Sequence, residues 1–112
     1  MDRKNILHKY KQTPLPIGVY RVRNNAKGKS FIGTSVNIPG VLNRHRFQLE
    51  HGSHSNRELQ NDWNEFGSDA FAFEFLDQIE PSDELNYNAS EDLQVLLQMW
   101  LEKLRNSSES LY

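Results

Sequence analysis

Alternating hydrophobic and polar positions are clearest in the first third of the chain. Residues 19–23 alternate β-forming side chains with long basic ones, which is the period-two pattern of a strand with one buried face. Residues 24–29 are typical of a turn, because Asn and Gly adopt positive φ at low cost, and residues 30–33 resume the apolar pattern. The pattern predicts a β-hairpin with Gly18 and Gly33 at its outer ends, where a side chain would collide with a close neighbour.

Apolar residues at helical spacing lie on both sides of this hairpin. Residues 2–12 predict a short helix, which the next two prolines end before the first strand. A second helix is expected to begin near Asn37 or Ile38, with Pro39 in its first turn, where a missing N–H costs nothing. Gly52 is expected to end this helix.

A third helix is marked by Ser55 and Glu58, which have the spacing of a capping box, and Gly67 is expected to end it. Residues 71–76 then place three phenylalanines on one face of a predicted third strand, and a polar loop follows. The acids after Ser90 suit the positive end of a last helix. The apolar face of this helix is expected to consist of Leu93, Leu96, Leu97, Trp100, Leu101 and Leu104.

The order of these elements is helix, hairpin, two helices, strand, helix. It predicts an α+β fold, an α/β sandwich in which helices flank a small, three-stranded, mainly antiparallel sheet. We expect one domain over residues 1–112. It consists of an N-terminal helical extension (1–15), a core (16–105) and a frayed tail (106–112).

Composition excludes several classes of protein. The 112 residues suffice for one small domain, and the absence of cysteine excludes disulfides, thiolate metal sites and cysteine nucleophiles. No apolar run approaches the roughly 18 residues of a membrane span. The N-terminus also lacks the apolar segment of a secretory signal. We therefore expect a cytoplasmic protein that makes no membrane contact.

The formal net charge of −2 conceals a strong asymmetry. Residues 1–60 carry eleven Lys and Arg against three Asp and Glu, a net charge of +8. Residues 61–112 carry two against twelve, a net charge of −10. A basic half could meet phosphate, whereas an acidic half would repel it, and a solvated surface of uneven charge remains the alternative interpretation.

The hairpin also carries a resemblance. Residues 18–20 (Gly-Val-Tyr) and, ten residues later, residues 31–33 (Phe-Ile-Gly) resemble the signature of the GIY-YIG nucleases. The segments 33–37, 54–67 and the strand from Phe71 fit the same family, so that the resemblance covers roughly residues 16–105. It implies the GIY-YIG fold and the hydrolysis of phosphodiesters with one divalent metal ion.

The resemblance places the family's catalytic groups on particular residues of this chain. Tyr20 matches the first motif tyrosine, whose hydroxyl would orient water or transfer a proton, whereas Phe31 replaces the second tyrosine. The position of the family's arginine falls on Val41, which cannot donate a hydrogen bond to phosphate. The position of the metal-binding glutamate falls on Leu97, which cannot bind a hard cation. Three changes toward apolar side chains indicate that the active site has decayed.

Other polar residues lie near these positions. Arg44 is three residues after Val41 and is expected to share its helix face. His45 and His54 resemble family positions at which histidines support catalysis or contact DNA. His51 and His54 straddle a glycine, which invites a metal interpretation, but histidines at a helix end are usually surface or capping groups. We predict no metal site and no cofactor, with Mg²⁺ implied only if nuclease activity survives.

Three hypotheses of function remain open. The leading one is a GIY-YIG-fold domain that has lost, or nearly lost, hydrolysis and binds nucleic acid weakly, with DNA as its partner. The second is an active metal-dependent endonuclease with a rearranged site built from Tyr20, Arg44 and His45. The third is a protein-interaction module without nucleic-acid binding, which the acidic half favours. The residues expected to contact nucleic acid are Arg21, Arg23, Lys27, Lys29, Arg44, Arg46, His54 and Arg57.

The leading hypothesis makes a geometric prediction. Catalytic groups must converge on one phosphate, so their replacements should converge as well. We expect Tyr20, Phe31, Val41 and Leu97 to line one shallow cleft that contains no Asp or Glu placed to bind a cation.

Overall fold

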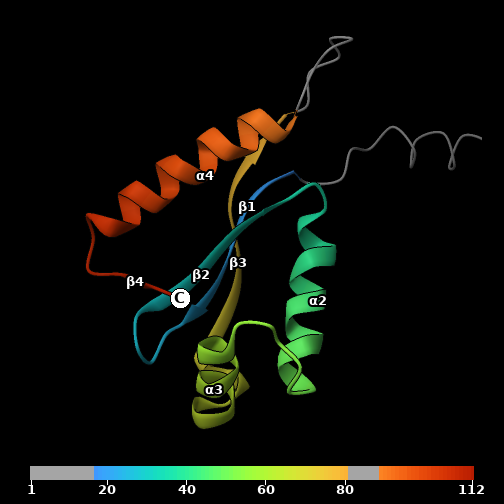
Figure 1. Ribbon diagram of the computed structural model, residues 1–112, viewed down its shortest axis with the longest axis vertical. Helices are drawn as coiled ribbons and strands as arrows, with labels where there is room; N and C mark the ends of the chain where they lie inside the picture. Colours follow the sequence, from blue (N-terminus) through green and yellow to red (C-terminus); the bar gives the residue numbers. More distant parts are fainter. Residues whose placement is uncertain (1–16, 81–88) are drawn as a thin grey trace, which may run out of the picture.

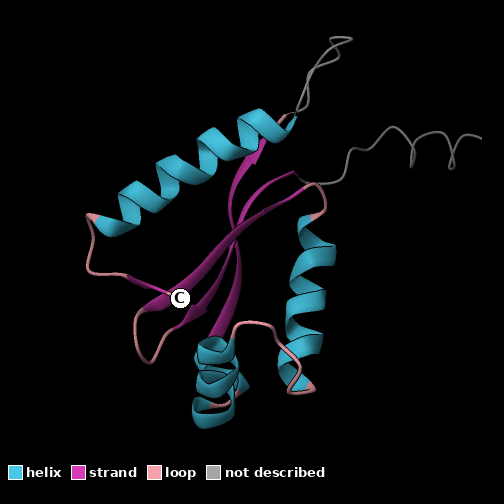
Figure 2. Ribbon diagram, viewed as in Figure 1, coloured by secondary structure: helices cyan, strands magenta, loops and turns pink. Residues whose placement is uncertain are grey.

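The computed structural model describes residues 17–80 and 89–112, which form an α+β fold with four strands and three α-helices (Figures 1 and 2). The strands are β1 (Ile17–Asn24), β2 (Lys29–Ser35), β3 (Phe71–Ile79) and β4 (Ser110–Leu111). The helices are α2 (Ile38–Glu50), α3 (Arg57–Phe66) and α4 (Ala89–Arg105), and the short 3-10 helix η1 (Ser68–Ala70) leads into β3. The helix predicted over residues 2–12 and most of the loop predicted before the last helix lie outside the described residues.

The predicted hairpin of β1 and β2 is confirmed. The two strands pair in antiparallel register from Gly18 opposite Ser35 to Asn24 opposite Lys29. Gly28 lies in the turn with a φ of +65°, and its N–H donates to the carbonyl of Asn24 at 2.9 Å. β3 pairs antiparallel with the other edge of β1, so the strand order is β3-β1-β2-β4.

The predictions of a three-stranded sheet and a frayed C-terminal tail are wrong. β4 pairs in parallel with the free edge of β2, where Ser110 N–H donates to the carbonyl of Gly28 at 3.0 Å and Tyr112 N–H to that of Ser30 at 2.9 Å. A strand of two residues is too short to show a period, and the polar sequence around it is also typical of a loop. Its position depends on contacts between residues far apart in the sequence, such as that of Tyr112 with Asp62, which a local hydrophobic pattern does not predict.

The sheet has two different faces because side chains alternate along β1. Val22 points to the face covered by α2 and α3, where it packs with Leu49, Leu59 and Trp63 in the main core. Alternate residues of β1, such as Val19, point to the opposite face. There the indole N–H of Trp100 on α4 donates at 3.0 Å to Asp77 of β3, which pairs with Val19. Figure 1 shows α4 (orange) and α2 (green) on opposite sides of the strands. The helices therefore form a layer on each side of the sheet.

The helix starts follow the predicted cap chemistry with one correction. α2 begins at Ile38, where a helix was expected, and the side chain of its cap Asn37 accepts from the N–H of Gly40 at 3.1 Å. The predicted cap of the next helix, Ser55, is wrong by one residue, because Asn56 accepts from the N–H of Leu59 at 3.0 Å. Both residue types cap helices well, so the sequence does not discriminate between them.

The predicted apolar face of α4 is only partly buried. Leu93 and Leu104 are buried, the other four members of the stripe are half-buried, and Val95 and Met99 are exposed. α4 lies over β1 and β2, so it covers the sheet with a single helix. Within the described residues, no helix is both long and apolar enough to span a bilayer.

The C-terminal residue joins β4 to the rest of the fold. The hydroxyl of Tyr112 donates to Asp62 on α3 at 2.6 Å and accepts from the side chain of Asn24 at 3.2 Å. Lys27 lies 3.3 Å from the same carboxylate, which is 5% exposed. Burial alone would raise the pKa of Asp62, but the hydrogen bonds from Tyr112 and Lys27 outweigh it and hold the pKa below its ordinary value.

Replacing Tyr112→Phe removes a donor to this buried carboxylate, so the free energy of unfolding at neutral pH should fall by about 1–2 kcal/mol. Urea denaturation of both proteins measures the difference. The depressed pKa of Asp62 contributes stability that is complete above its unfolded pKa of about 4 and is lost as the pH falls through the folded pKa. The stability difference should therefore shrink in acid.

An Asp62→Asn background provides the control for this prediction. There, Tyr112→Phe should cost less than in the unmodified chain, because the charged acceptor is gone. Equal costs in the two backgrounds would mean that Tyr112 stabilises the fold without this carboxylate.

Candidate functional site

Tyr20 is the motif residue around which the candidate site is built. Its side chain points from β1 to the face covered by α2, and its partner across the hairpin is Gly33. A Cβ at Gly33 would lie 2.6 Å from Cζ of Tyr20, and a Cβ at Gly18 would lie 1.9 Å from the carbonyl oxygen of Asp77. The predicted collisions at the two glycines are therefore confirmed, and at Gly33 the close neighbour is the motif tyrosine itself.

Tyr20 ends a buried row of hydrogen bonds. Its hydroxyl oxygen lies 2.8 Å from Nε2 of His45 on α2, and Nδ1 of His45 lies 2.7 Å from Nε2 of His54. Nδ1 of His54 accepts the backbone N–H of Asn56 at 3.0 Å. His45 is 7% exposed and His54 is 3% exposed, and the ring of Phe31 packs against both imidazoles.

The backbone N–H at the end of this row fixes the direction of every bond in it. A backbone N–H can only donate, so Nδ1 of His54 carries no proton, and a neutral His54 must donate from Nε2 to Nδ1 of His45. A neutral His45 then carries its proton on Nε2 and donates to the oxygen of Tyr20. The hydroxyl proton of Tyr20 is left to donate to a group outside the row.

The electrostatics agree with neutral histidines. Burial, followed by the neighbouring His54 and Arg44, lowers the pKa of His45 to about 4. Burial also lowers the pKa of His54, and it raises the pKa of Tyr20 against an opposing effect of Arg44. At neutral pH both imidazoles are therefore uncharged and the phenol keeps its proton.

The residues at and near the family's arginine position line a small pocket at the start of α2. It has a volume of about 350 Å³ and is lined by Ser35, Asn37, Gly40, Val41 and Arg44. The expectation that Val41 and Arg44 share a face is confirmed. The predicted four-residue cleft is wrong, because Val41 is the only one of the four residues that lines this pocket. Tyr20 and Phe31 lie side by side but outside its lining, and Leu97 is on α4.

The pocket does not fit the divalent metal that the GIY-YIG resemblance implies. Mg²⁺ prefers oxygen ligands and is usually bound through carboxylates, but no Asp or Glu lines the pocket. Within residues 17–80 and 89–112, no three His, Asp or Glu side chains gather closely enough to hold a metal ion.

The residues expected to contact nucleic acid do not lie on one face of the fold. Alternation along β1 turns Arg21 and Arg23 away from Tyr20, toward the face of α4. Four of the predicted contacts with nucleic acid are paired with carboxylates, and these ion pairs are Arg21–Glu74, Arg23–Glu109, Lys27–Asp62 and Lys29–Glu58. The acidic half of the chain thus folds back onto the basic half.

The remaining four predicted contacts each have a different environment. Arg44 lines the pocket at the start of α2, and Arg57 is exposed at the start of α3. The guanidinium of Arg46 lies 4.5 Å from the ring centroid of Phe73. Among the described residues, these three arginines have no carboxylate partner. His54 is buried in the row, so it supports the site rather than forming its surface.

Two residues that sequence analysis did not single out hold the histidines in place. Asn56 supplies the N–H that fixes the tautomers, and the side chain of Gln60 accepts the N–H of His54 at 3.1 Å. Gln60 also donates to the carbonyl of Leu49 at 2.9 Å. The sequence feature that could have indicated this role is the polar Gln60 next to the buried Leu59 on α3.

Comparisons with known proteins agree on the fold. The sequence matches no protein-family profile and no curated protein. The structure is similar to two solved structures of the catalytic domain of the homing endonuclease I-TevI, an intron endonuclease. A variant of that domain gives a TM-score of 0.67 at 22% identity, over 86% of this chain and 91% of that chain. The second structure gives 0.66 at 23%, over 84% and 94%. The chain therefore has a GIY-YIG-like fold, as the motif residues predict.

The low pKa of His45 makes stability depend on pH. Between about 6.5 and about 4 the unfolded chain binds a proton that the folded chain does not, so the free energy of unfolding should fall as the pH drops through this range. The full loss is at most about 3 kcal/mol. Urea denaturation across this range measures it, and NMR titration of the imidazole should give a midpoint near 4 for His45.

A His45→Gln variant should lose most of this dependence. The exposed His51, which bonds to the carbonyl of Phe47, provides the matched control, and His51→Gln should leave the dependence intact. A midpoint for His45 near its ordinary value of 6.5 would contradict the neutral row.

Proposed function

We propose that this domain binds the phosphate backbone of nucleic acid at the pocket at the start of α2 and does not hydrolyse it. One observation carries the proposal: this pocket brings a cationic side chain and the first turn of a helix together without any carboxylate. Arg44 supplies the charge, and the positive end of α2 and the hydroxyl of Ser35 suit an anion as well.

Tyr20 adds a donor to this arrangement. Its oxygen accepts from His45, so its own proton is free for a phosphate oxygen. Arg44 lies close enough to oppose the rise in the pKa of Tyr20 and to lower that of His45, which places its charge beside the row. A phosphate bound by Arg44 would therefore lie near a preformed hydroxyl donor.

The same groups are poorly suited to hydrolysis. Cleavage of a phosphodiester needs a base for the attacking water and cations for the charge that develops on the phosphate. Burial keeps Tyr20 protonated, so it is a poor base at neutral pH. Val41 supplies no cation, and the pocket offers no carboxylate for a metal ion.

A second candidate function rests on the position of Arg44. Because it lines the same pocket as Val41, it could replace the lost arginine from one turn further along α2. The domain would then be an active endonuclease with a rearranged site. The shared pocket supports this alternative, whereas the missing carboxylates oppose it.

Binding of DNA should be weak and sensitive to salt, because each neutralised phosphate releases counterions and four of the basic residues are already paired. Fluorescence anisotropy of a short labelled duplex at several salt concentrations measures it. Arg44→Ala should weaken binding roughly tenfold at low salt and reduce the slope of log K against log salt by about 1.

Arg105→Ala provides the matched control, since Arg105 is exposed at the end of α4, away from the pocket. It should leave both affinity and slope nearly unchanged. Absence of binding at low salt would remove the proposal and favour a protein-interaction module. Equal losses from the two variants would show that binding does not use the pocket.

A further inference from the structure

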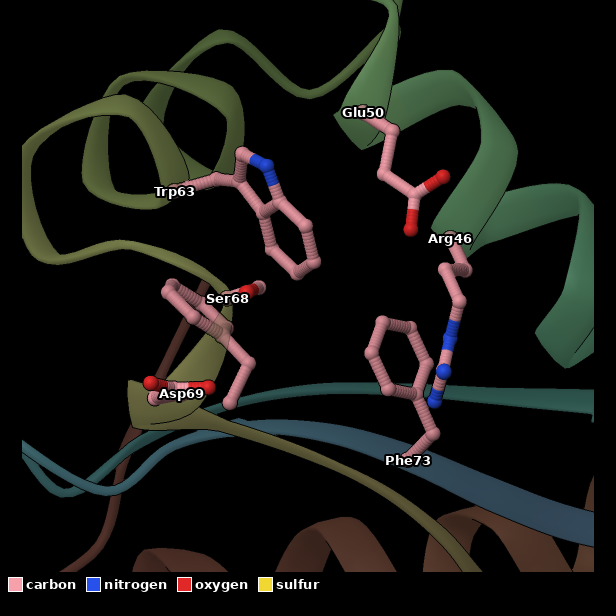
Figure 3. A pocket seen from close by; sticks show the side chains of 7 residues that line it. Arg46, Glu50, Trp63, Ser68, Asp69 and Phe73 are labelled. Atoms are coloured by element: carbon pink, nitrogen blue, oxygen red, sulfur yellow. The ribbon is translucent and has the colours of Figure 1, made fainter.

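A second pocket lies on the other flank of α2, between that helix, α3 and β3. Its volume is about 380 Å³, which is within the range of small-molecule sites. Figure 3 shows its side chains, with Trp63 and Phe73 on two sides and the carboxylate of Glu50 reaching toward the space between them. The lining consists of Arg46, Glu50, Trp63, Ser68, Asp69, Phe71 and Phe73.

The indole N–H of Trp63 lacks a partner in this pocket. Trp63 is 8% exposed, and within residues 17–80 and 89–112 its nitrogen makes no hydrogen bond. Buried donors are nearly always satisfied by protein, water or ligand, so this N–H is available to an acceptor that enters the pocket. In Figure 3 the nitrogen lies on the edge of the indole that faces Glu50. The orphan donor and a carboxylate acceptor are thus presented to the same space.

The remaining polar groups of the pocket are also uncommitted. Within the described part of the chain, Glu50 and Asp69 form no ion pair, and Arg46 is held by the ring of Phe73 rather than by a carboxylate. The pocket therefore combines aromatic surfaces with two carboxylates, those of Glu50 and Asp69, and with the N–H donors of Trp63 and Arg46. Flat, polar-edged rings are the ligands that such a combination fits.

We propose that this pocket binds a guanine base. The inference rests on the proposed function, because nucleic acid bound by the domain would supply the base. Guanine presents two adjacent N–H donors, at N1 and N2, which the carboxylate of Glu50 can accept together. Its O6 and N7 are acceptors, which suit the indole of Trp63 and the guanidinium of Arg46. Among the common bases, adenine, cytosine and uracil lack the paired donors.

An organic cation is the competing occupant, because aromatic walls and carboxylates also attract cations. The guanidinium of Arg46 already lies over Phe73, and its charge repels a second cation at that ring. A neutral base meets no such repulsion. The aromatic walls alone do not distinguish the two occupants, so the test includes both.

The test uses Trp63 as its own reporter. The chain has two tryptophans, so Trp100→Phe leaves the fluorescence of Trp63 alone. Titration with the 5′-monophosphates of the four ribonucleosides should give saturable quenching, with the guanosine nucleotide bound roughly tenfold more tightly than the others. The phosphate is common to all four, so loss of phosphate binding changes their affinities alike and leaves this preference intact.

Glu50→Gln should reduce the affinity for the guanosine nucleotide about tenfold and remove the preference, because the amide cannot accept from both N–H groups. Glu65→Gln on the exposed side of α3 makes the same change of charge outside the pocket and should have no effect. The indole N–H resonances of the unmodified chain give a second measurement if Trp100→Phe disturbs folding, and that of Trp63 should shift.

Three results would overturn the proposal. The first is quenching that does not saturate or that is equal for all four nucleotides. The second is quenching by choline and not by the guanosine nucleotide. The third is a preference for guanine that persists in Glu50→Gln.

Discussion

The buried row from Tyr20 to the backbone of Asn56 is the constraint on which the site depends. It joins β1, the middle of α2 and the segment before α3, which are far apart in the sequence. Uncompensated polar groups at such depth would be costly, so the position of α2 against the sheet is tied to the hydrogen bonds of His45 and His54. The backbone N–H of Asn56 can only donate a hydrogen bond, whereas each imidazole can either donate or accept. This N–H therefore sets the direction of the whole row.

That direction has a chemical consequence. A row that donates toward Tyr20 makes this residue a donor to whatever lies beyond it, and burial keeps its proton in place. Such a hydroxyl binds an anion well and deprotonates water poorly. The first turn of α2 and Arg44 meet at a pocket whose lining contains no carboxylate for a metal ion.

The sequence predicted the fold well because local patterns determine it. The hairpin, the phenylalanine strand and the helices follow from periodicity and turn residues, and the two motif residues Tyr20 and Phe31 lie side by side on the hairpin. β4 could not be predicted, since two residues have no period and its position depends on contacts such as that of Tyr112 with Asp62.

The electrostatic surface could not be predicted from charge counts. The excess of positive charge in the first half suggested a broad basic face, but strand alternation sends Arg21 and Arg23 to the far side of the sheet. Carboxylates from the second half, among them Glu74 and Glu109, then pair with them. A net charge per segment says nothing of which residues meet across the fold, so the exposed cations were fewer than expected.

The central claim is that this fold binds a phosphodiester without cleaving it. Incubating the full chain with supercoiled plasmid and either Mg²⁺ or Mn²⁺, and following the nicked form over time, tests it most directly. The account predicts no nicking above a metal-only control. Robust metal-dependent nicking that Arg44→Ala or Tyr20→Phe abolishes would contradict it. That result would show that the domain is an active nuclease in which Arg44 takes the role of the family's arginine.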